Sequence, residues 1–224
     1  MTTKKETLEE RNARTRRQNE AFERLSAPKK RVSIAHDVLA QIDLNRIRVE
    51  TGTYFESEVF KKQLFEIMNG EASSSKQLQT VFRKVETCTA CALGSMFLCG
   101  VETANKLKIR ETNLVRMSLL MSEDVYTYLS RFFSMEQLVV IESAFEHRNM
   151  LREHRRMSKK FNYLSGKALQ SLELEVTDAV TFGNLESNDT IRLQLIMRNI
   201  IANRGTFNPK DRPFNGWVTP NYNS

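Results

Sequence analysis

Two cysteines three residues apart, Cys88 and Cys91, form the pattern in this sequence that is best suited to chemistry. This spacing lets two thiolates share one tetrahedral metal ion or close a redox-active disulfide. A structural zinc site needs two further ligands, and the three histidines of the chain supply no second close pair. A thioredoxin-like redox site needs a preceding β-strand, whereas the flanking residues predict a helix. Packing in the core is therefore the favoured interpretation, and Cys88 and Cys91 are weak candidates for metal ligands.

An arginine-rich stretch near the N-terminus is the second pattern with chemical meaning. Four arginines within seven residues would cover a helix with bidentate donors for phosphate groups, and the asparagine and glutamine among them can reach base edges. The alternative is a solvated helix in which neighbouring glutamates pair with the arginines. The four residues are Arg11, Arg14, Arg16 and Arg17.

A second basic segment follows later in the chain, between residues 146 and 160. Most of its basic residues are spaced by three or four, so that they would form one face of a helix. These residues are Arg148, Arg152, Arg155, Arg156, Lys159 and Lys160.

The net charge of the chain is concentrated in these two segments. The whole chain carries +7, residues 1–31 carry +5 and residues 146–160 carry +4, so that the remainder is slightly negative. A localised basic patch is the usual mark of a polyanionic partner. We therefore expect nucleic acid or an acidic protein surface as the partner.

The sequence shows no recognisable catalytic motif. It contains no nucleophile elbow, no H-E-x-x-H, no phosphate-binding glycine loop and no dinucleotide fingerprint. Glu6, Glu9, Glu10, Glu102 and Glu142 read as ordinary carboxylates of helix surfaces. We therefore predict no catalytic residue and no cofactor, and an enzyme with a thiol or metal site remains the less favoured hypothesis.

Composition limits the class of protein. The 224 residues are 40% hydrophobic and 27% charged, which is close to a soluble average and enough for one domain with its own core. No apolar run approaches the roughly 20 residues that cross a bilayer, and the charged start shows no secretory signal. Three cysteines within twelve residues do not suggest a disulfide framework. We expect a cytoplasmic protein, or a virion protein if a phage encodes it.

Hydrophobic periodicity predicts the elements that must position these residues. The fold class expected is mainly α, with about seven or eight helices and one small β-hairpin near residues 46–56. Residues 1–31 are predicted to form a basic helical arm, residues 32–207 a single helical domain, and residues 208–224 a tail. The most apolar helical region is expected at residues 76–107, where it would contain all three cysteines.

Local signals place several helix ends. Ser33 can cap the first helix of the domain, after Pro28 has broken the arm. Ser134 opens a predicted capping box with Gln137, and the segment around Asn188 should cap the last helix. The pattern of residues 172–180 fits a strand or a helix and does not decide between them.

Four stretches carry a resemblance to known sequences. Residues 30–39 run on to a glycine turn at 52–54, residues 91–94 read Cys-Ala-Leu-Gly, and the other two stretches are 137–146 and 197–207. In these stretches the chain resembles a family of short, uncharacterised proteins from bacteria and their phages. The resemblance implies a domain from about residue 30 to residue 207 with the arm outside it, and it implies no activity, ligand or catalytic residue.

These observations lead to one hypothesis and a rival. The first is a non-enzymatic, helical binding or accessory protein of a phage or mobile element, whose basic arm and basic helix engage a polyanion. The rival is a virion structural or assembly protein whose arm docks on neighbouring subunits of a homo-oligomer or larger assembly.

Overall fold

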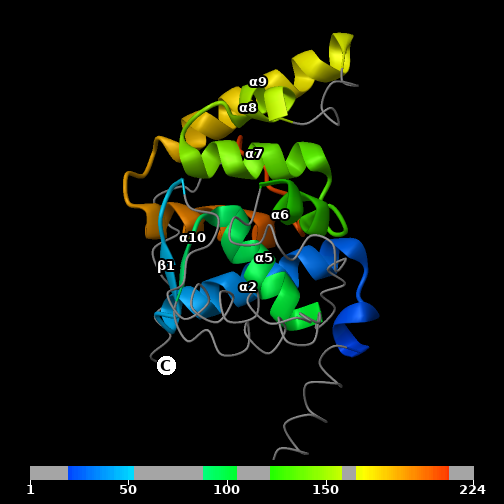
Figure 1. Cartoon of the computed structure of the whole chain (residues 1–224), viewed down its shortest axis with the longest axis vertical. Coiled ribbons are helices and arrows are strands. Elements are labelled where there is room, and N and C mark those ends of the chain that lie inside the picture. Colours follow the sequence, from blue (N-terminus) through cyan, green and yellow to red (C-terminus); the bar gives the residue numbers. More distant parts are fainter. Residues whose placement is uncertain (1–19, 53–87, 105–121, 158–164, 212–224) are drawn as a thin grey trace, which may run out of the picture.

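In the computed structural model, residues 20–52, 88–104, 122–157 and 165–211 are described. They form a mainly α-helical structure with one small two-stranded sheet, which confirms the expected fold class (Figure 1). No helix in these ranges is long and apolar enough to cross a membrane. The elements are α2 (Ala27–Asp43), β1 (Ile47–Val49), β2 (Cys88–Ala90), α5 (Ala92–Ala104), α6 (Ser122–Leu129), α7 (Met135–Glu146), α8 (Met150–Met157), α9 (Gly166–Gly183) and α10 (Asp189–Ala202).

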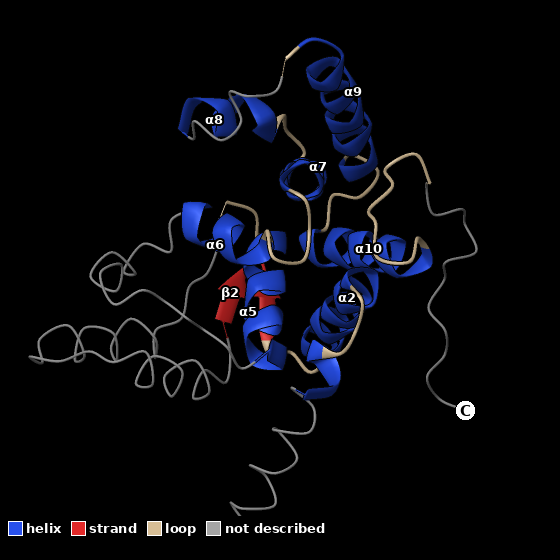
Figure 2. Cartoon of the chain, turned by 90° about the vertical axis from the view of Figure 1, so that its right-hand side faces the viewer, coloured by secondary structure: helices blue, strands red, loops and turns tan. Residues whose placement is uncertain are grey.

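Helix α7 lies between two groups of helices, with α8 and α9 on one side and α5, α6 and α10 on the other (Figures 1 and 2). Every residue from Leu138 to Phe145 is buried, as a helix with neighbours all round must be. The Ser134 side chain accepts the Gln137 N–H at 3.2 Å, so the predicted cap forms. The Gln137 side chain does not complete a capping box; instead it bonds both backbone polar groups of Phe207.

Helix α2 begins at Ala27, six residues before the predicted cap at Ser33. The expected break between the arm and the first helix of the domain is present at residues 24–26, but Ala27, which was expected outside a helix, begins α2 just before Pro28. Pro28 stands in the first turn of α2, where the N–H that proline lacks would have had no partner within the helix. Ile34, Val38 and Ile42 are buried at the spacing that the sequence indicated, and α2 packs against α10 and α5.

The chain is already part of the folded structure before residue 32. Phe22 is buried, and its ring meets that of Phe132 edge to face with centroids 5.9 Å apart. The Arg31 guanidinium donates hydrogen bonds to the carbonyls of Gly205 and Phe132. The boundary drawn at residue 31 therefore falls inside α2, and residues 1–19 of the predicted arm lie outside the described residues.

The sheet joins β1 and β2 in parallel, with Ile47 opposite Cys88 and Val49 opposite Ala90. The first strand of the predicted hairpin therefore exists, but its described partner is distant in sequence, and residues 53–56 lie outside the described ranges. The helical region expected over 76–107, as one helix or a pair, was wrong at residues 88–91, because β2 occupies 88–90 and α5 begins only at Ala92. Pairing with β1 outweighs the helical periodicity there, as tertiary contacts commonly outweigh local propensity.

Helices α9 and α10 complete the described structure. Residues 172–180, for which strand and helix stayed open, belong to α9. Leu172, Val176 and Ala179 are buried at helical spacing, and α9 packs mainly on α7. The Asn188 side chain accepts the Ile191 N–H at 3.1 Å and so caps α10, as the sequence predicted.

The segment after α10 is fixed to that helix by Asn199. The Asn199 amide donates to the carbonyls of Asn208 and Asp211 at 2.9 and 2.8 Å, and its oxygen accepts the Asn208 N–H at 2.8 Å. The Phe207 ring is buried edge to face against Phe182, with centroids 5.2 Å apart. Residues 208–211, the start of the predicted tail, are thus held on the body, and residues 212–224 lie outside the described part.

Replacing Gly205 with alanine should destabilise the protein in two ways. Gly205 has a φ of 96°, which an L residue adopts at a cost of about 1–2 kcal/mol. A Cβ there would also stand 2.5 Å from the backbone oxygen of Pro28, in the first turn of α2. Gly166→Ala is the matched control, because Gly166 has a φ of 57° and open space around it. In urea unfolding, Gly205→Ala should lose more stability than Gly166→Ala, and equal losses would contradict the close contact.

Candidate functional site

Helix α8 exposes arginines on one side and buries the other. Met150, Leu151 and His154 are all buried. Arg152 and Arg155 are exposed, and their separation of three residues makes them neighbours on the helix surface. In the part of the chain that the structure describes, neither arginine has a carboxylate within ion-pair distance.

The other residues of the predicted basic face are placed less completely. Arg148 precedes α8 with its side chain 56% exposed, and its guanidinium lies 3.6 Å from the Glu153 carboxylate. Such an exposed pair is weak and leaves the arginine available to a stronger acceptor. Arg156 lies in the last turn of α8. Lys159, Lys160, Arg11, Arg14, Arg16 and Arg17 lie outside the described residues.

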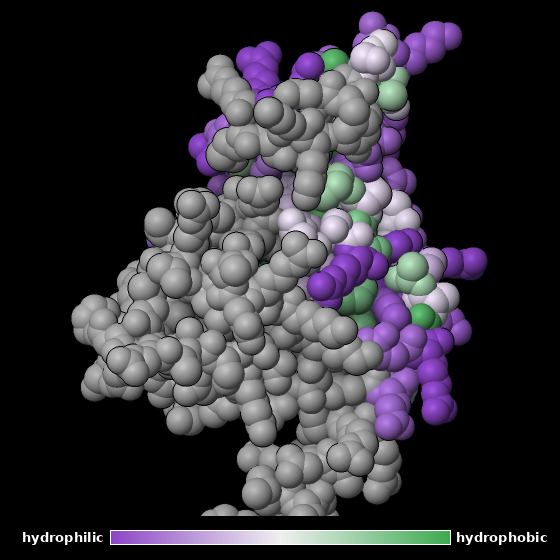
Figure 3. Space-filling view, turned by 45° about the vertical axis from the view of Figure 1, so that its right-hand side comes forward, coloured by the Kyte–Doolittle hydropathy of each residue, from purple (hydrophilic) through white to green (hydrophobic). Residues whose placement is uncertain are grey.

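Helices α8 and α9 lie toward one end of the long axis, and the first described helical turns, drawn in blue in Figure 1, lie toward the other. On the face shown in Figure 3, the described side chains are mostly hydrophilic, with hydrophobic ones scattered among them. Hydrophilic side chains project from the upper end, where Figure 1 places α8 and α9. The exposed arginines of α8 are therefore remote from the described start of the chain.

A buried carboxylate lies directly under α8. Glu142 of α7 is 2% exposed, and its Oε2 atom lies 2.7 Å from Nε2 of His154 on α8. The Tyr126 hydroxyl of α6 donates to the same oxygen at 2.5 Å. The rings of Tyr126 and His154 also touch, with centroids 4.4 Å apart. The Oε2 atom of Glu142 therefore joins α6, α7 and α8.

The neighbouring residue of α7 holds the start of α8. The Ser143 hydroxyl accepts the backbone N–H of Met150 at 3.2 Å, which satisfies one of the unpaired donors at the helix N-terminus. Consecutive side chains of α7 therefore hold the first and the fifth residue of α8.

The interpretation of Glu142 as a surface carboxylate was wrong. The signal that could have corrected it is its place within a run of apolar residues from 138 to 145, because a carboxylate inside such a run is buried and needs partners.

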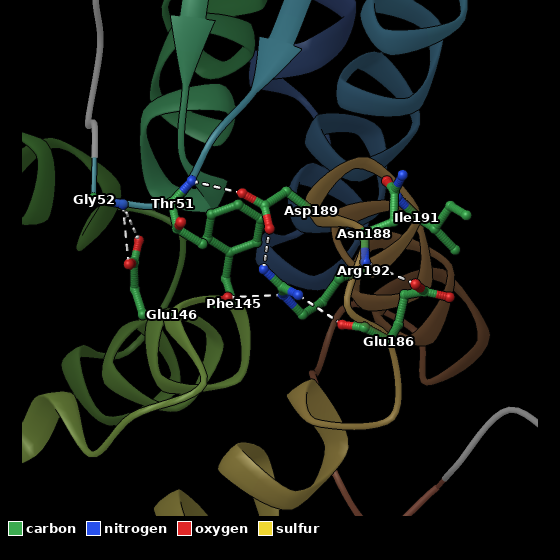
Figure 4. A network of polar contacts seen from close by, with 9 residues as sticks. All are labelled: Thr51, Gly52, Phe145, Glu146, Glu186, Asn188, Asp189, Ile191 and Arg192. Atoms are coloured by element: carbon green, nitrogen blue, oxygen red, sulfur yellow. Dashed lines mark hydrogen bonds and ion pairs between the residues drawn. The ribbon is translucent and has the colours of Figure 1, made fainter.

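A second buried charge joins α10 to α7 and to the end of β1 (Figure 4). The Arg192 side chain is fully buried and donates to the backbone carbonyls of Phe145 and Glu186 at 2.8 and 2.6 Å. Its third contact is Oδ1 of Asp189 at 2.5 Å. The other oxygen of Asp189 accepts the Thr51 N–H at 2.9 Å, just beyond β1. The sequence analysis missed this arginine, which occupies a buried position of the amphipathic stripe of α10.

Glu146, at the C-terminal end of α7, accepts the Gly52 N–H with both carboxylate oxygens, at 3.1 and 3.0 Å (Figure 4). Burial raises the pKa of the Glu146 carboxyl, and the negative charges of Glu142 and Asp189 raise this pKa further. The Gly52 N–H and the Arg148 charge act in the opposite direction but do not cancel the effect. The carboxylates of Glu142 and Asp189 and the guanidinium of Arg148 are therefore close enough to Glu146 to affect its pKa.

All three cysteines lie in the described part of the chain, where they are buried and form no disulfide bond. Burial raises the pKa of Cys88 to about 12 and also raises that of Cys91, where the charges of Glu142 and Glu146 add to the effect of burial. Cys91 follows β2 and precedes α5, so the strand-then-helix setting of a redox cysteine, thought to be missing, is present. Both thiols stay protonated at neutral pH, which makes them poor nucleophiles. Within the described ranges, no group of three His, Cys, Asp or Glu side chains is placed to hold a metal ion.

Replacing Glu146 with glutamine should alter how stability depends on pH. A raised native pKa contributes stability that is complete below the unfolded pKa, about 4.3 for glutamate, and that is lost as the pH rises through the native pKa. Glutamine avoids this loss, and its oxygen can still accept the Gly52 N–H. In urea unfolding at several pH values, the stability of Glu146→Gln relative to the native chain should therefore rise from acid to neutral pH. A difference that stays constant or falls with pH would contradict the effect of burial.

The cysteines should be unreactive in the folded protein. Because burial keeps Cys88 and Cys91 protonated, maleimide should label all three thiols slowly in the native state and rapidly in urea. Cys91→Ser should cost about 1–3 kcal/mol more than Cys91→Ala if the new hydroxyl finds no partner. Rapid native labelling of two thiols would show instead that the C-x-x-C pair is accessible to chemistry.

Comparison with protein-family models, with curated proteins and with solved structures finds no match to this chain. The resemblance to a bacterial and phage family noted in the sequence therefore stays a prediction.

Proposed function

We propose that the protein is a non-enzymatic helical binding protein that engages nucleic acid through the exposed side of α8. The observation that carries this proposal is the division of α8 between a buried face and an exposed pair, Arg152 and Arg155. Arginine binds phosphate through two parallel hydrogen bonds and is less strongly hydrated than lysine. Two arginines three residues apart are neighbours on the helix surface and can therefore contact neighbouring phosphates of one strand.

Arg148 supports the same interface from the turn before α8. Its pairing with Glu153 is long and exposed, so a phosphate can replace the carboxylate at little cost. The arginines at 11–17 and the lysines at 159 and 160 would extend the contact, as the sequence suggests. Contacts between arginines and phosphate groups carry no sequence information, so we expect binding with little sequence preference. A phage or mobile-element role remains part of this proposal through the sequence resemblance.

Charge reversal on α8 tests the proposal. Arg152→Glu together with Arg155→Glu should weaken binding to a duplex of about 20 base pairs, measured by fluorescence anisotropy at about 50 mM salt. Loss of two phosphate contacts should also reduce the magnitude of the log–log salt slope by about 2, since each contact contributes about 0.9. A matched single strand in the same assay shows which form of nucleic acid is preferred.

The control carries the same change of charge elsewhere. Arg46 and Arg48 are exposed beside and within β1, and Arg46→Glu with Arg48→Glu alters the net charge equally. This control should keep most of the affinity and the original salt slope. Equal losses in both variants would point to a general charge effect, and absence of binding by the native chain at about 50 mM salt would rule out nucleic acid as the partner.

A further inference from the structure

Helix α8 is too short to hold its own conformation. Isolated helices below about 12–15 residues are marginal in water, and α8 has 8 residues. Its buried apolar contacts within residues 150–155 come from Met150 and Leu151. The arginines of the exposed side add repulsion between like charges. The orientation of α8 must therefore depend strongly on contacts with the helices beneath it.

The polar contacts under α8 come from one turn of α7. Glu142 reaches Nε2 of His154, and Ser143 accepts the Met150 N–H. Tyr126 of α6 donates to the same Glu142 oxygen and packs its ring on the imidazole. His154 lies between Arg152 and Arg155 in sequence, so a rotation of α8 that broke this contact would also move both arginines.

We propose that Glu142 is a positioning residue which, through His154, holds α8 in the orientation that presents Arg152 and Arg155 to a polyanion. This inference rests on the proposed function for its consequence, and on the Tyr126–Glu142–His154 geometry for its cause. We call α8 docked when the contact between His154 and Glu142 is made, and only docked molecules are then able to bind. The apparent dissociation constant then equals the intrinsic one divided by the docked fraction of α8.

Two pairs of variants separate the polar contact from mere space filling. His154→Leu fills similar volume without a donor, whereas the amide nitrogen of His154→Gln can replace the imidazole N–H. Likewise, Glu142→Leu leaves the tyrosine and the histidine without this carboxylate. In Glu142→Gln, the amide oxygen can take the place of Oε2 and accept from both the Tyr126 hydroxyl and the His154 Nε2–H. The glutamine variants should therefore rescue what the leucine variants lose.

The first readout is amide hydrogen exchange in peptides that cover α8 and α10. In His154→Leu and Glu142→Leu, exchange within α8 should approach the rate of an unprotected peptide while α10 stays close to native, because local opening is reported segment by segment. Both glutamine variants should remain close to native in α8. Asn199→Leu is the control. It removes hydrogen bonds near the C-terminal end of α10 and should leave exchange in α8 unchanged.

The second readout is affinity for the same duplex of about 20 base pairs at about 50 mM salt. If the docked fraction falls to about one tenth, exchange in α8 loses nearly all of its protection and the dissociation constant should rise about tenfold. Nearly complete loss of protection in α8 with unchanged affinity would overturn the proposed coupling, and so would native exchange in both leucine variants. If the leucine variants do not fold, His154→Asn takes their place, because its shorter amide can replace Nδ1 of the imidazole but not Nε2, the atom that contacts Glu142.

These outcomes stay distinct from those of the proposed function. If the native chain binds no nucleic acid, the proposed function fails, while hydrogen exchange still decides whether Glu142 positions α8. If the native chain binds and the leucine variants bind equally well, the positioning role fails and the proposed function stands.

Discussion

A guanidinium group from which water is excluded must find its hydrogen-bond partners inside the protein. Arg192 imposes this condition where α10 meets α7 and the end of β1. Removing one partner of a buried ion pair typically costs about 3–5 kcal/mol. Arg192 donates to the carbonyl of Phe145, which is one of the last four carbonyls of α7. The last four carbonyls of a helix find no N–H donor within that helix. Arg192 therefore caps one helix from within another, and its cation also suits the negative end of the α7 dipole.

Asp189 extends this constraint to the sheet. Its position in the first turn of α10 suits the positive end of that helix dipole, and its two oxygens serve Arg192 and the Thr51 N–H. Glu146 holds the next N–H along the chain, that of Gly52. The end of β1 is thus joined to both α7 and α10 by carboxylates. Crowding of these carboxylates has a physical consequence, which is the raised pKa of Glu146.

The sequence indicated those features that depend on neighbouring residues. The caps at Ser134 and Asn188 follow from side chains that reach their own helix, and the stripe of Ile34, Val38 and Ile42 follows from helical periodicity. Features that depend on distant partners escaped prediction. Strand β2 exists because β1 lies beside it, and Gln137 bonds Phe207 although its spacing from Ser134 suits a capping box.

The candidate site shows the same division. The exposed arginines of α8 are visible in the sequence because exposed charge at a spacing of three or four needs no partner to be recognised. The residues under them are not visible in this way, because Glu142, His154 and Tyr126 belong to three helices and come together only in the folded chain. Their separation in sequence is what allows one carboxylate to join α6, α7 and α8.

The C-x-x-C pair shows why spacing alone does not define chemistry. Cys91 lies at the N-terminus of α5, where the N–H groups of Leu93 and Gly94 favour a thiolate, as they do in reactive cysteines. Burial outweighs those two donors, and the negative charges of Glu142 and Glu146 act in the same direction as burial. The carboxylate that helps to hold α8 therefore also helps to keep the thiol protonated. One carboxylate of α7 thus contacts α8 through His154 and also disfavours nucleophilic chemistry at Cys91.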